Sequence, residues 1–128
     1  MTENEISKII IGAAIEVHRT LGGPGLLEGV YEEALAYELS LRGLKVGRQL
    51  EVPISYKGAL LESPLRLDLL VNDLVIVDCN AVTQYNSIFE SQVLTYLRLT
   101  NKRLGMVINF GERRVVDGIH RVVNNLIE

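Results

Sequence analysis

The sequence predicts an α/β sandwich in which a mixed central sheet of about four strands is flanked by helices, in the order ααβββαβα. Two amphipathic helical patterns open the chain, and about forty residues of β-branched and alternating sequence follow them. Helical spacing then returns before one more apolar strand. The 128 residues contain no repeat, low-complexity tract or linker, so we expect a single domain over residues 1–128.

Two helices are expected in the first third of the chain. The first covers residues about 5 to 20, where apolar side chains recur three or four positions apart: Ile6, Ile9, Ile10, Ala13, Val17 and Leu21. The segment "LGGPG" ends it. The second helix runs from near Leu27 to about Arg42, and Gly43 supplies its stop. Its inward side is expected to carry Val30, Ala34, Tyr37 and Leu41.

The remaining elements follow from the same patterns. The segments "KVGRQLEVPISYKG", "ALLESPLRLDLLV" and "LVIV" predict three consecutive strands in an antiparallel meander, with a turn at Lys57-Gly58. Residues 87–100 return to helical spacing, and "RLGMVINF" reads as a strand. Because a helical crossover precedes it, this strand should lie parallel to the third. A short helix over about Asp117 to Leu126 is expected to close the chain.

Composition limits the classes of protein that fit. No window reaches the roughly 18 consecutive apolar residues of a membrane span, and "MTENEISK" lacks the basic start of a signal peptide. A cytoplasmic location is therefore expected. The single cysteine, Cys79, excludes an internal disulfide and a cysteine-cluster metal site, so packing is its expected role.

The net charge of −3 and pI near 5.4 give no global attraction to nucleic acid. Binding of DNA or RNA rests largely on Lys and Arg side chains that neutralise phosphates, so it requires a local basic patch. Lys102-Arg103 and Arg113-Arg114 are the candidate pairs. Solvated surface charge is the simpler explanation of each.

Polar side chains interrupt the apolar strands. Asp78 and Asn80 follow "LVIV" two positions apart, so they share one face of a strand. Burying them unpaired would be costly, so they lie at a strand end open to water or belong to a site. Further candidates are Asp68 in "RLDLLV", Glu28 at the start of the second helix, and Gln92 with Tyr96 one helical turn apart. Each also has an ordinary explanation, as a solvent-facing acid, a helix-dipole partner or a surface pair.

The two aspartates can act together only if the hairpin between their strands has the right register. A two-residue turn at Asn72-Asp73 would place Asp68 and Asp78 on opposite faces. A shared site therefore demands an odd loop, such as Asn72 to Leu74, or a bulge.

Gly25, Glu28 and Tyr31 spell a GxxExxY signature within "IIGAAIEVHRTLGGPGLLEGVYEEALAYEL". With "RLDLLV", "VIVDCNAV", "QVLTYLRLT" and "LGMVINFG", this segment resembles the GxxExxY protein family, and through it the PD-(D/E)XK nuclease superfamily. The resemblance covers nearly the whole chain. It implies a restriction-endonuclease-like sandwich and metal-dependent hydrolysis of phosphodiester bonds.

The same resemblance implies a role for each candidate residue. Asp68 and Asp78 match the two metal-binding acids, and Glu28 matches a helical acid that contributes to the metal site. Gln92 and Tyr96 match a QxxxY element. In such sites carboxylates hold Mg²⁺ or Mn²⁺, with help from the main-chain oxygen at the position of Cys79, and the ion activates an attacking water.

Asn80 departs from this pattern, which has lysine two residues after the second acid. Lysine would place a positive charge beside the reacting phosphate, whereas an amide offers only a dipole. Lys57 and Lys102 are candidates for a lysine that has moved. Asp78 stands where the GxxExxY family has glutamate, and "LGGPG" carries an additional glycine.

Three functions remain open from the sequence. The first is a nuclease with weak or lost activity, and the second is a catalytically inactive module that binds nucleic acid or a protein partner. In the third the acids bind a divalent ion only for stability.

For His18 we expect a structural hydrogen bond rather than a zinc site, because no second histidine or cysteine is near, and we expect His120 at the surface. The sequence leaves the oligomeric state open.

Overall fold

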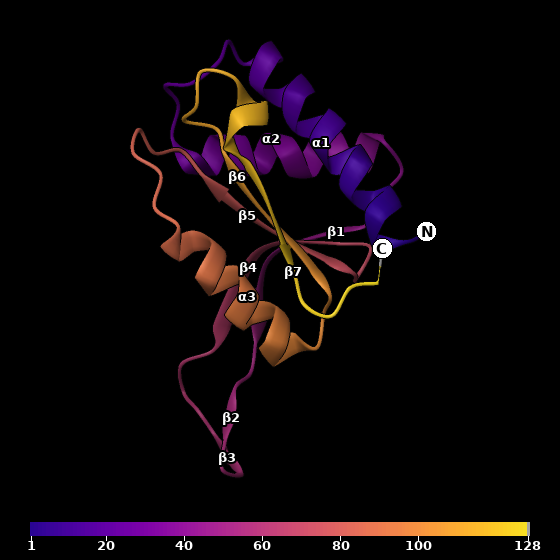
Figure 1. The fold of residues 1–128 in the computed structure, drawn as a ribbon, viewed down its shortest axis with the longest axis vertical. Coiled ribbons are helices and arrows are strands. Elements are labelled where there is room, and N and C mark those ends of the chain that lie inside the picture. The colour runs from indigo at the N-terminus through magenta and orange to yellow at the C-terminus, as the bar shows by residue number, and fades with distance from the viewer. Residues whose placement is uncertain (128) are drawn as a thin grey trace.

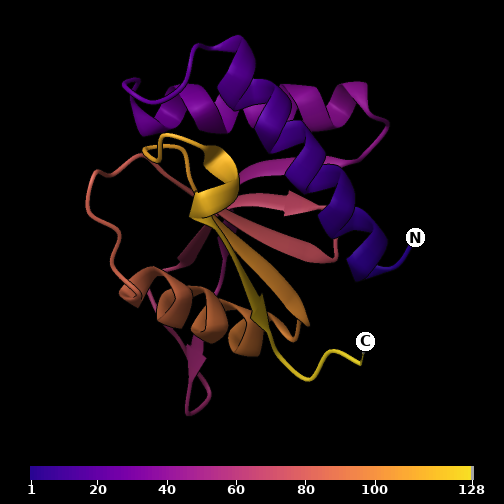
Figure 2. The same cartoon turned by 45° about the horizontal axis from the view of Figure 1, so that its top comes forward.

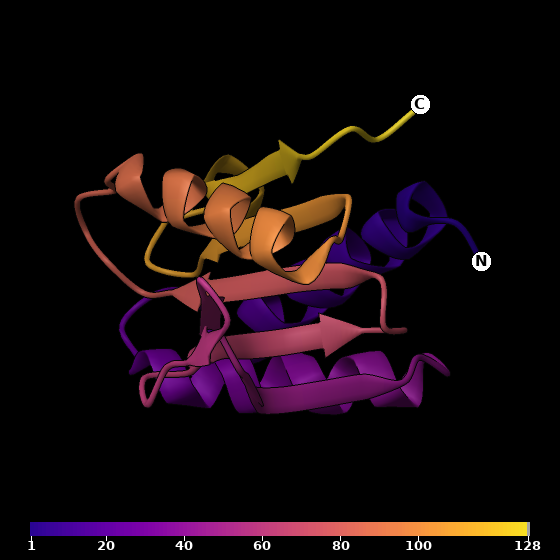
Figure 3. The same cartoon turned by 90° about the horizontal axis from the view of Figure 1, so that it is seen from below.

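A computed structural model describes residues 1–127 (Figure 1). The central sheet has the strand order β1-β4-β5-β6-β7, seen face-on in Figure 3. Its strands are β1 (Val46–Val52), β4 (Leu65–Val71), β5 (Val75–Asn80), β6 (Leu104–Asn109) and β7 (Ile119–Val123). Helices α1 (Glu3–Thr20) and α2 (Glu28–Leu41) cover one face, and α3 (Ile88–Thr100) covers the other (Figure 2). The remaining elements are β2 (Ser55–Tyr56), β3 (Ala59–Leu60) and the 3-10 helix η1 (Val115–Gly118).

The predicted fold class is confirmed. Strands β1, β4 and β5 form the expected antiparallel meander, and β6 lies parallel to β5 after the α3 crossover. Strands β2 and β3 form a small hairpin that projects from the body between β1 and β4 (Figure 1). Its turn is Lys57-Gly58, as predicted, and both residues have positive φ, as a tight hairpin turn requires.

The predicted terminal helix is wrong, and the sheet has five strands rather than about four. Residues 119–123 form β7, which pairs antiparallel with β6 from Ile108↔Ile119 to Leu104↔Val123. The segment contains Ile119, Val122 and Val123, and β-branched side chains of this kind fit a pleated surface better than a helix. Pairing with β7 also satisfies the backbone groups of β6, which would otherwise form an open edge.

Helix α1 begins as its sequence predicts. Thr2 and Glu5 form a capping box, with the Glu5 N–H donating to Thr2 Oγ1 at 3.2 Å and the Thr2 N–H donating to Glu5 Oε1 at 2.9 Å. Of the side chains expected to face inward, the following are buried: Ile6, Ile10, Ala13 and Val17. Leu21 lies beyond the end of the helix and is exposed.

Helix α2 has the predicted bounds but the opposite inward face. Gly43, at φ 86°, ends it, and the N–H groups of Gly43 and Leu44 bond to Ser40 O and Leu39 O. The buried side chains are Tyr31, Glu32, Leu35 and Leu39, whereas Val30, Tyr37 and Leu41 are exposed. Both sets of apolar residues have helical spacing, so periodicity alone cannot choose between them.

Two apolar clusters fill the two sides of the sheet. The larger lies between the sheet and helices α1 and α2, and the Tyr31 ring stacks there on Phe110 with centroids 4.8 Å apart. The smaller lies under α3, around Val93 and Leu97. Within residues 1–127, no helix has the length and apolarity that a membrane crossing requires.

Candidate active site

The β4–β5 hairpin has the odd loop that a shared site requires. Val71 pairs with Val75 and Leu69 with Val77, so the loop consists of the three residues 72–74. Continuing this register by one residue places Asp68 directly opposite Asp78. The predicted condition for bringing the two carboxylates together is therefore met.

Strands β4 and β5 separate at Asp68 and Asp78. Their paired register stops at Leu69↔Val77, and the Asp68 carboxylate takes the next backbone donor, because Cys79 N–H donates to Asp68 Oδ2 at 2.9 Å. Leu67 packs in the α3-side cluster but Leu69 packs on the α1 and α2 side. Residues two apart in a regular strand share a face, so β4 twists sharply at Asp68.

Strand β1 is distorted at the same level. Gln49 lies between Arg48 and Leu50, which pair with Leu69 and Leu67, and it has φ 52° in the middle of the strand. Such a conformation is strained for a residue other than glycine. The Gln49 side-chain amide donates to Glu32 Oε1 at 2.7 Å and to Asp68 Oδ1 at 3.4 Å. The strained residue thus links helix α2 to the aspartate pair.

Glu32 is a residue of this region that the sequence analysis missed. It is only 4% exposed, and Arg48 Nε donates to its Oε2 at 2.9 Å. Its buried charge is therefore paired, as a buried carboxylate requires. The sequence does contain a sign of it: Glu32 lies four residues after Glu28, so both acids lie on one face of the helix.

The surroundings of the two aspartates favour their protonated forms. Burial raises the pKa of Asp68 to about 7, helped by the negative charges of Asp78 and Glu32 and opposed by the hydrogen bond from Cys79 N–H. Burial also raises the pKa of Asp78, against hydrogen bonds from Asn80 and Asp68 that lower it. Each of the two carboxyl groups affects the pKa of the other, so Asp68 and Asp78 titrate as a pair.

Asn80 is tied to the second acid of the pair. It is 7% exposed, and its side-chain Nδ2 donates to Asp78 Oδ2 at 2.9 Å. The two candidate lysines lie elsewhere. Lys102 Nζ is 3.5 Å from Asp73 in the β4–β5 turn, and Lys57 lies over the Tyr56 ring at the tip of the β2–β3 hairpin.

Glu28 stands at the first residue of α2, on the surface. Partial burial raises the pKa of its carboxyl group, and the negative charges of Asp78 and Glu32 raise it further. The chain therefore brings Glu28 within electrostatic range of the pair. Within residues 1–127, however, no three His, Cys, Asp or Glu side chains are grouped so that they could hold a metal ion. The role of Glu28 as a third ligand stays a prediction.

The α3 residues differ in their relation to the pair. Tyr96 is half-buried, and burial together with the charges of Asp78 and Asp68 raises its pKa, so it lies within electrostatic range of the aspartates. Gln92 is exposed one turn earlier. Tyr85 was not predicted. Burial raises its pKa, with contributions from its hydrogen bond to Glu90 and from the charge of Asp78.

The histidines and the cysteine have mainly structural surroundings. His18 is buried, and its Nε2–H donates to Glu112 O at 3.0 Å, which confirms the expected structural hydrogen bond. His120 is half-buried rather than on the surface, because its ring stacks on Tyr85 with centroids 4.1 Å apart. Cys79 is fully buried in the larger core cluster.

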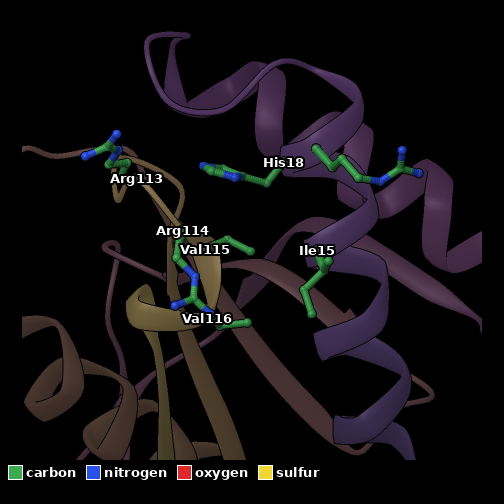
Figure 4. Close-up of a pocket in the computed structure, with 7 residues that line it drawn as sticks. Ile15, His18, Arg113, Arg114, Val115 and Val116 are labelled. Atoms are coloured by element: carbon green, nitrogen blue, oxygen red, sulfur yellow. The ribbon is translucent and has the colours of Figure 1, made fainter.

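A cavity with basic residues in its lining lies between α1 and the segment that follows β6. The last residue of β6, Asn109, pairs with Asn80 at the end of β5. The cavity has a volume of about 380 Å³. Figure 4 shows His18 and Ile15 on its α1 side, facing the segment that carries Arg113 and Arg114. Both arginines are exposed, so their charges are available to an anion in solvent.

The chain matches the family model described as the PD-(D/E)XK nuclease superfamily over residues 4–122. No curated protein and no solved structure matches it. The family match covers the sheet and all three helices, including the hairpin that places Asp68 opposite Asp78. This chain therefore belongs to the PD-(D/E)XK nuclease superfamily.

Proposed function

We propose that the protein hydrolyses phosphodiester bonds of DNA or RNA with Mg²⁺ or Mn²⁺, at a rate that Asn80 holds low. The observation that carries the proposal is the direct opposition of Asp68 and Asp78 at the point where β4 and β5 part. Membership of the superfamily supplies the reaction class. The two aspartates are the proposed site of this reaction.

The donor set suits a hard divalent cation. Asp68 and Asp78 offer carboxylate oxygens, the ligands that Mg²⁺ and Mn²⁺ prefer. Burial raises the pKa of both groups, helped by nearby negative charge, and a bound cation would favour their ionised forms. These two residues would hold the ion, with Glu28 as the proposed third ligand. When bound, the ion would polarise the scissile phosphate and lower the pKa of an attacking water.

The surrounding residues hold the two acids in place. Cys79 N–H and the Gln49 amide both donate to the Asp68 carboxylate, and Asn80 donates to Asp78. Donors of this kind fix the orientation of a ligand before it binds its ion. On α3, Tyr96 lies within electrostatic range of the pair, and Gln92 is proposed to contact the substrate from its exposed position.

The low rate follows from a missing positive charge. The Asn80 amide donates to Asp78, but it carries no charge to place beside the developing negative charge on the phosphate. Arg48 is the cation tied into this polar network, and its guanidinium is bonded to Glu32. Asp68 and Asp78 are therefore proposed to support cleavage without an unpaired lysine or arginine side chain beside the phosphate.

Replacing Asn80 by lysine tests the proposal. Asn80→Lys should raise or create Mn²⁺-dependent cleavage of labelled single- or double-stranded DNA or RNA. The expected gain is on the order of 100-fold, the usual effect of one such charged group on the rate. Asn80→Lys/Asp78→Ala is the matched control and should be inactive, which separates this activity from that of a contaminating nuclease.

Metal binding supplies the second readout. Titration calorimetry of the parent with Mn²⁺ should give binding that Asp68→Ala abolishes. Equal binding by Asp68→Ala would contradict the assignment of the ligands. Should Asn80→Lys fold and bind Mn²⁺ yet cleave none of the substrates, loss of the lysine would not explain the low activity.

The alternative is a catalytically inactive module that binds nucleic acid or a protein partner. The observation that favours it is the basic cavity between α1 and η1, with Arg113 and Arg114 exposed at its margin. Arginines gain affinity for nucleic acid by neutralising phosphates, and this requires no catalysis. Binding of an oligonucleotide by the parent and by Asn80→Lys, with no cleavage by either, would favour this second function.

A further inference from the structure

An apolar stripe runs along the outer side of helix α2. It consists of five residues with alternating spacings of three and four, and we call it the α2 stripe: Leu27, Val30, Ala34, Tyr37 and Leu41. Four of these side chains are large and exposed, from 44% for Val30 to 81% for Leu27. The core takes a different stripe of the same helix, headed by Tyr31. Ala34 packs partly against the core, but the four large exposed side chains of the stripe lie outside both core clusters.

The surface beside the stripe is hollowed on both sides of Tyr37. One hollow of about 260 Å³ lies toward α1 and is lined by Val17, Leu21 and Leu41, among others. A second, of about 360 Å³, lies between Tyr37 and Val30. A protruding aromatic ring between two hollows has the shape that knobs-into-holes packing of a second helix requires.

The stripe is complementary to itself when two copies run antiparallel. With Ala34 on the two-fold axis, Leu27 of one helix lies opposite Leu41 of the other, and Val30 lies opposite Tyr37. Each large residue then meets a large one, and the small alanine stands where the two helices come closest. Such an isologous contact places the same residues on both partners.

The charges beside the stripe also suit a second copy. Both signs of charge occur there, because Glu38 lies 2.8 Å from Arg42 and Glu33 lies 3.9 Å from Arg48, which also bonds to Glu32. A margin that carries both signs repels its own copy little. A partner recognised by opposite charge would instead require an excess of one sign.

From these observations we infer that the α2 stripe is a homodimer interface in which two α2 helices pack antiparallel about Ala34. A helix of this length is about 21 Å long and about 10 Å wide, a smaller footprint than the about 800 Å² per partner of a standard interface. The dimer is therefore weak, with a Kd on the order of 10 µM.

Disulfide trapping tests the register of the two helices. Two helices 8–10 Å apart bring the Cα atoms at the two-fold axis to about 3–5 Å, which overlaps the range of a disulfide. Ala34→Cys should therefore form a covalent dimer rapidly under mild oxidation. The native Cys79 is fully buried and does not compete.

Ser40→Cys is the matched control on the same helix. It is exposed, but in the antiparallel register the two residues at position 40 lie about 18 Å apart along the axes. It should form no dimer beyond slow collisional linking. Equal rates for Ala34→Cys and Ser40→Cys would overturn the proposed register.

Sedimentation velocity tests the association without a cross-link. The parent should change from monomer to dimer between about 1 and about 200 µM, as a Kd near 10 µM requires. Leu41→Glu should stay monomeric, and Leu60→Glu, which changes an exposed leucine of the β2–β3 hairpin, should behave as the parent. A parent that is monomeric throughout would overturn the proposal and leave the stripe to a different partner. A dimer lost in Leu60→Glu but kept in Leu41→Glu would also overturn it.

Discussion

At the scale of single residues, the aspartate pair makes the fold sensitive to pH. The pKa of Asp68 rises to about 7 in the folded chain because the carboxyl group is buried beside Asp78 and Glu32. In an unfolded chain an aspartate titrates near 4. Folding therefore favours the protonated carboxyl, and this contribution to stability is complete below about pH 4 and is lost as the pH rises through about 7.

Asp68→Asn should remove this dependence, because the amide resembles the protonated acid at every pH. We expect the parent to lose stability relative to Asp68→Asn between about pH 4 and about pH 7. Urea unfolding in EDTA measures the difference, and Asp117→Asn, a change at an exposed acid of η1, is the control. Parallel profiles of the parent and Asp68→Asn would contradict the raised pKa.

The residues of the site were predictable only in part. Asp78 and Asn80 stand out because polar side chains break an apolar strand, and the requirement for an odd hairpin loop could be stated from the spacing alone. Gln49 and Tyr85 could not be found in this way. Their places in the site depend on a strained backbone and on packing between distant elements, which local patterns do not encode.

At the scale of elements, strand and helix patterns predicted most bounds but failed where two structures compete. The last segment became β7 because the edge of β6 offers backbone partners that a lone terminal helix would not use. The face of α2 was misassigned because two apolar stripes share one helix, and packing against Phe110 selects the one with Tyr31. Tertiary contacts decide both cases.

Tyr31 also connects α2 to the turn that precedes it. Its buried hydroxyl donates to Gly23 O at 2.7 Å and accepts from Leu26 N–H at 3.2 Å, so one side chain closes the turn between α1 and α2. This turn leads into the first residue of α2, Glu28. Tyr31 thus holds the α1–α2 turn by hydrogen bonds and packs on Phe110 in the core.

Tyr31→Phe should destabilise the fold by about 1–3 kcal/mol, because it keeps the ring but leaves two backbone groups without their partner. Tyr56→Phe, which removes an exposed hydroxyl of the β2–β3 hairpin, should change the free energy of unfolding little. Urea unfolding of both variants measures the contrast. Equal effects would mean that the Tyr31 hydroxyl does not hold the turn.

At the scale of the whole molecule, charge is distributed unevenly. The chain carries a net charge of −3, yet Arg113 and Arg114 stand together beside the cavity that follows β6. The other basic pair has a different setting, because Lys102 lies beside Asp73 at the turn that begins β5, whereas Asp78 lies toward its end. We therefore expect a strand of nucleic acid that reaches the aspartate pair to contact Arg113 and Arg114 rather than Lys102 and Arg103.

The two basic pairs should consequently differ in their effect on binding. Arg113→Ala/Arg114→Ala should weaken binding of a single-stranded oligonucleotide and reduce the slope of log affinity against log salt by about 1.4, since each lost phosphate contact on a single strand removes about 0.7. Lys102→Ala/Arg103→Ala changes the same number of charges and should alter the slope little. Fluorescence anisotropy over a salt series, with Ca²⁺ in place of Mg²⁺ to suppress cleavage, measures both. Equal slopes for the two double variants would mean that nucleic acid does not follow the segment after β6 that carries Arg113 and Arg114.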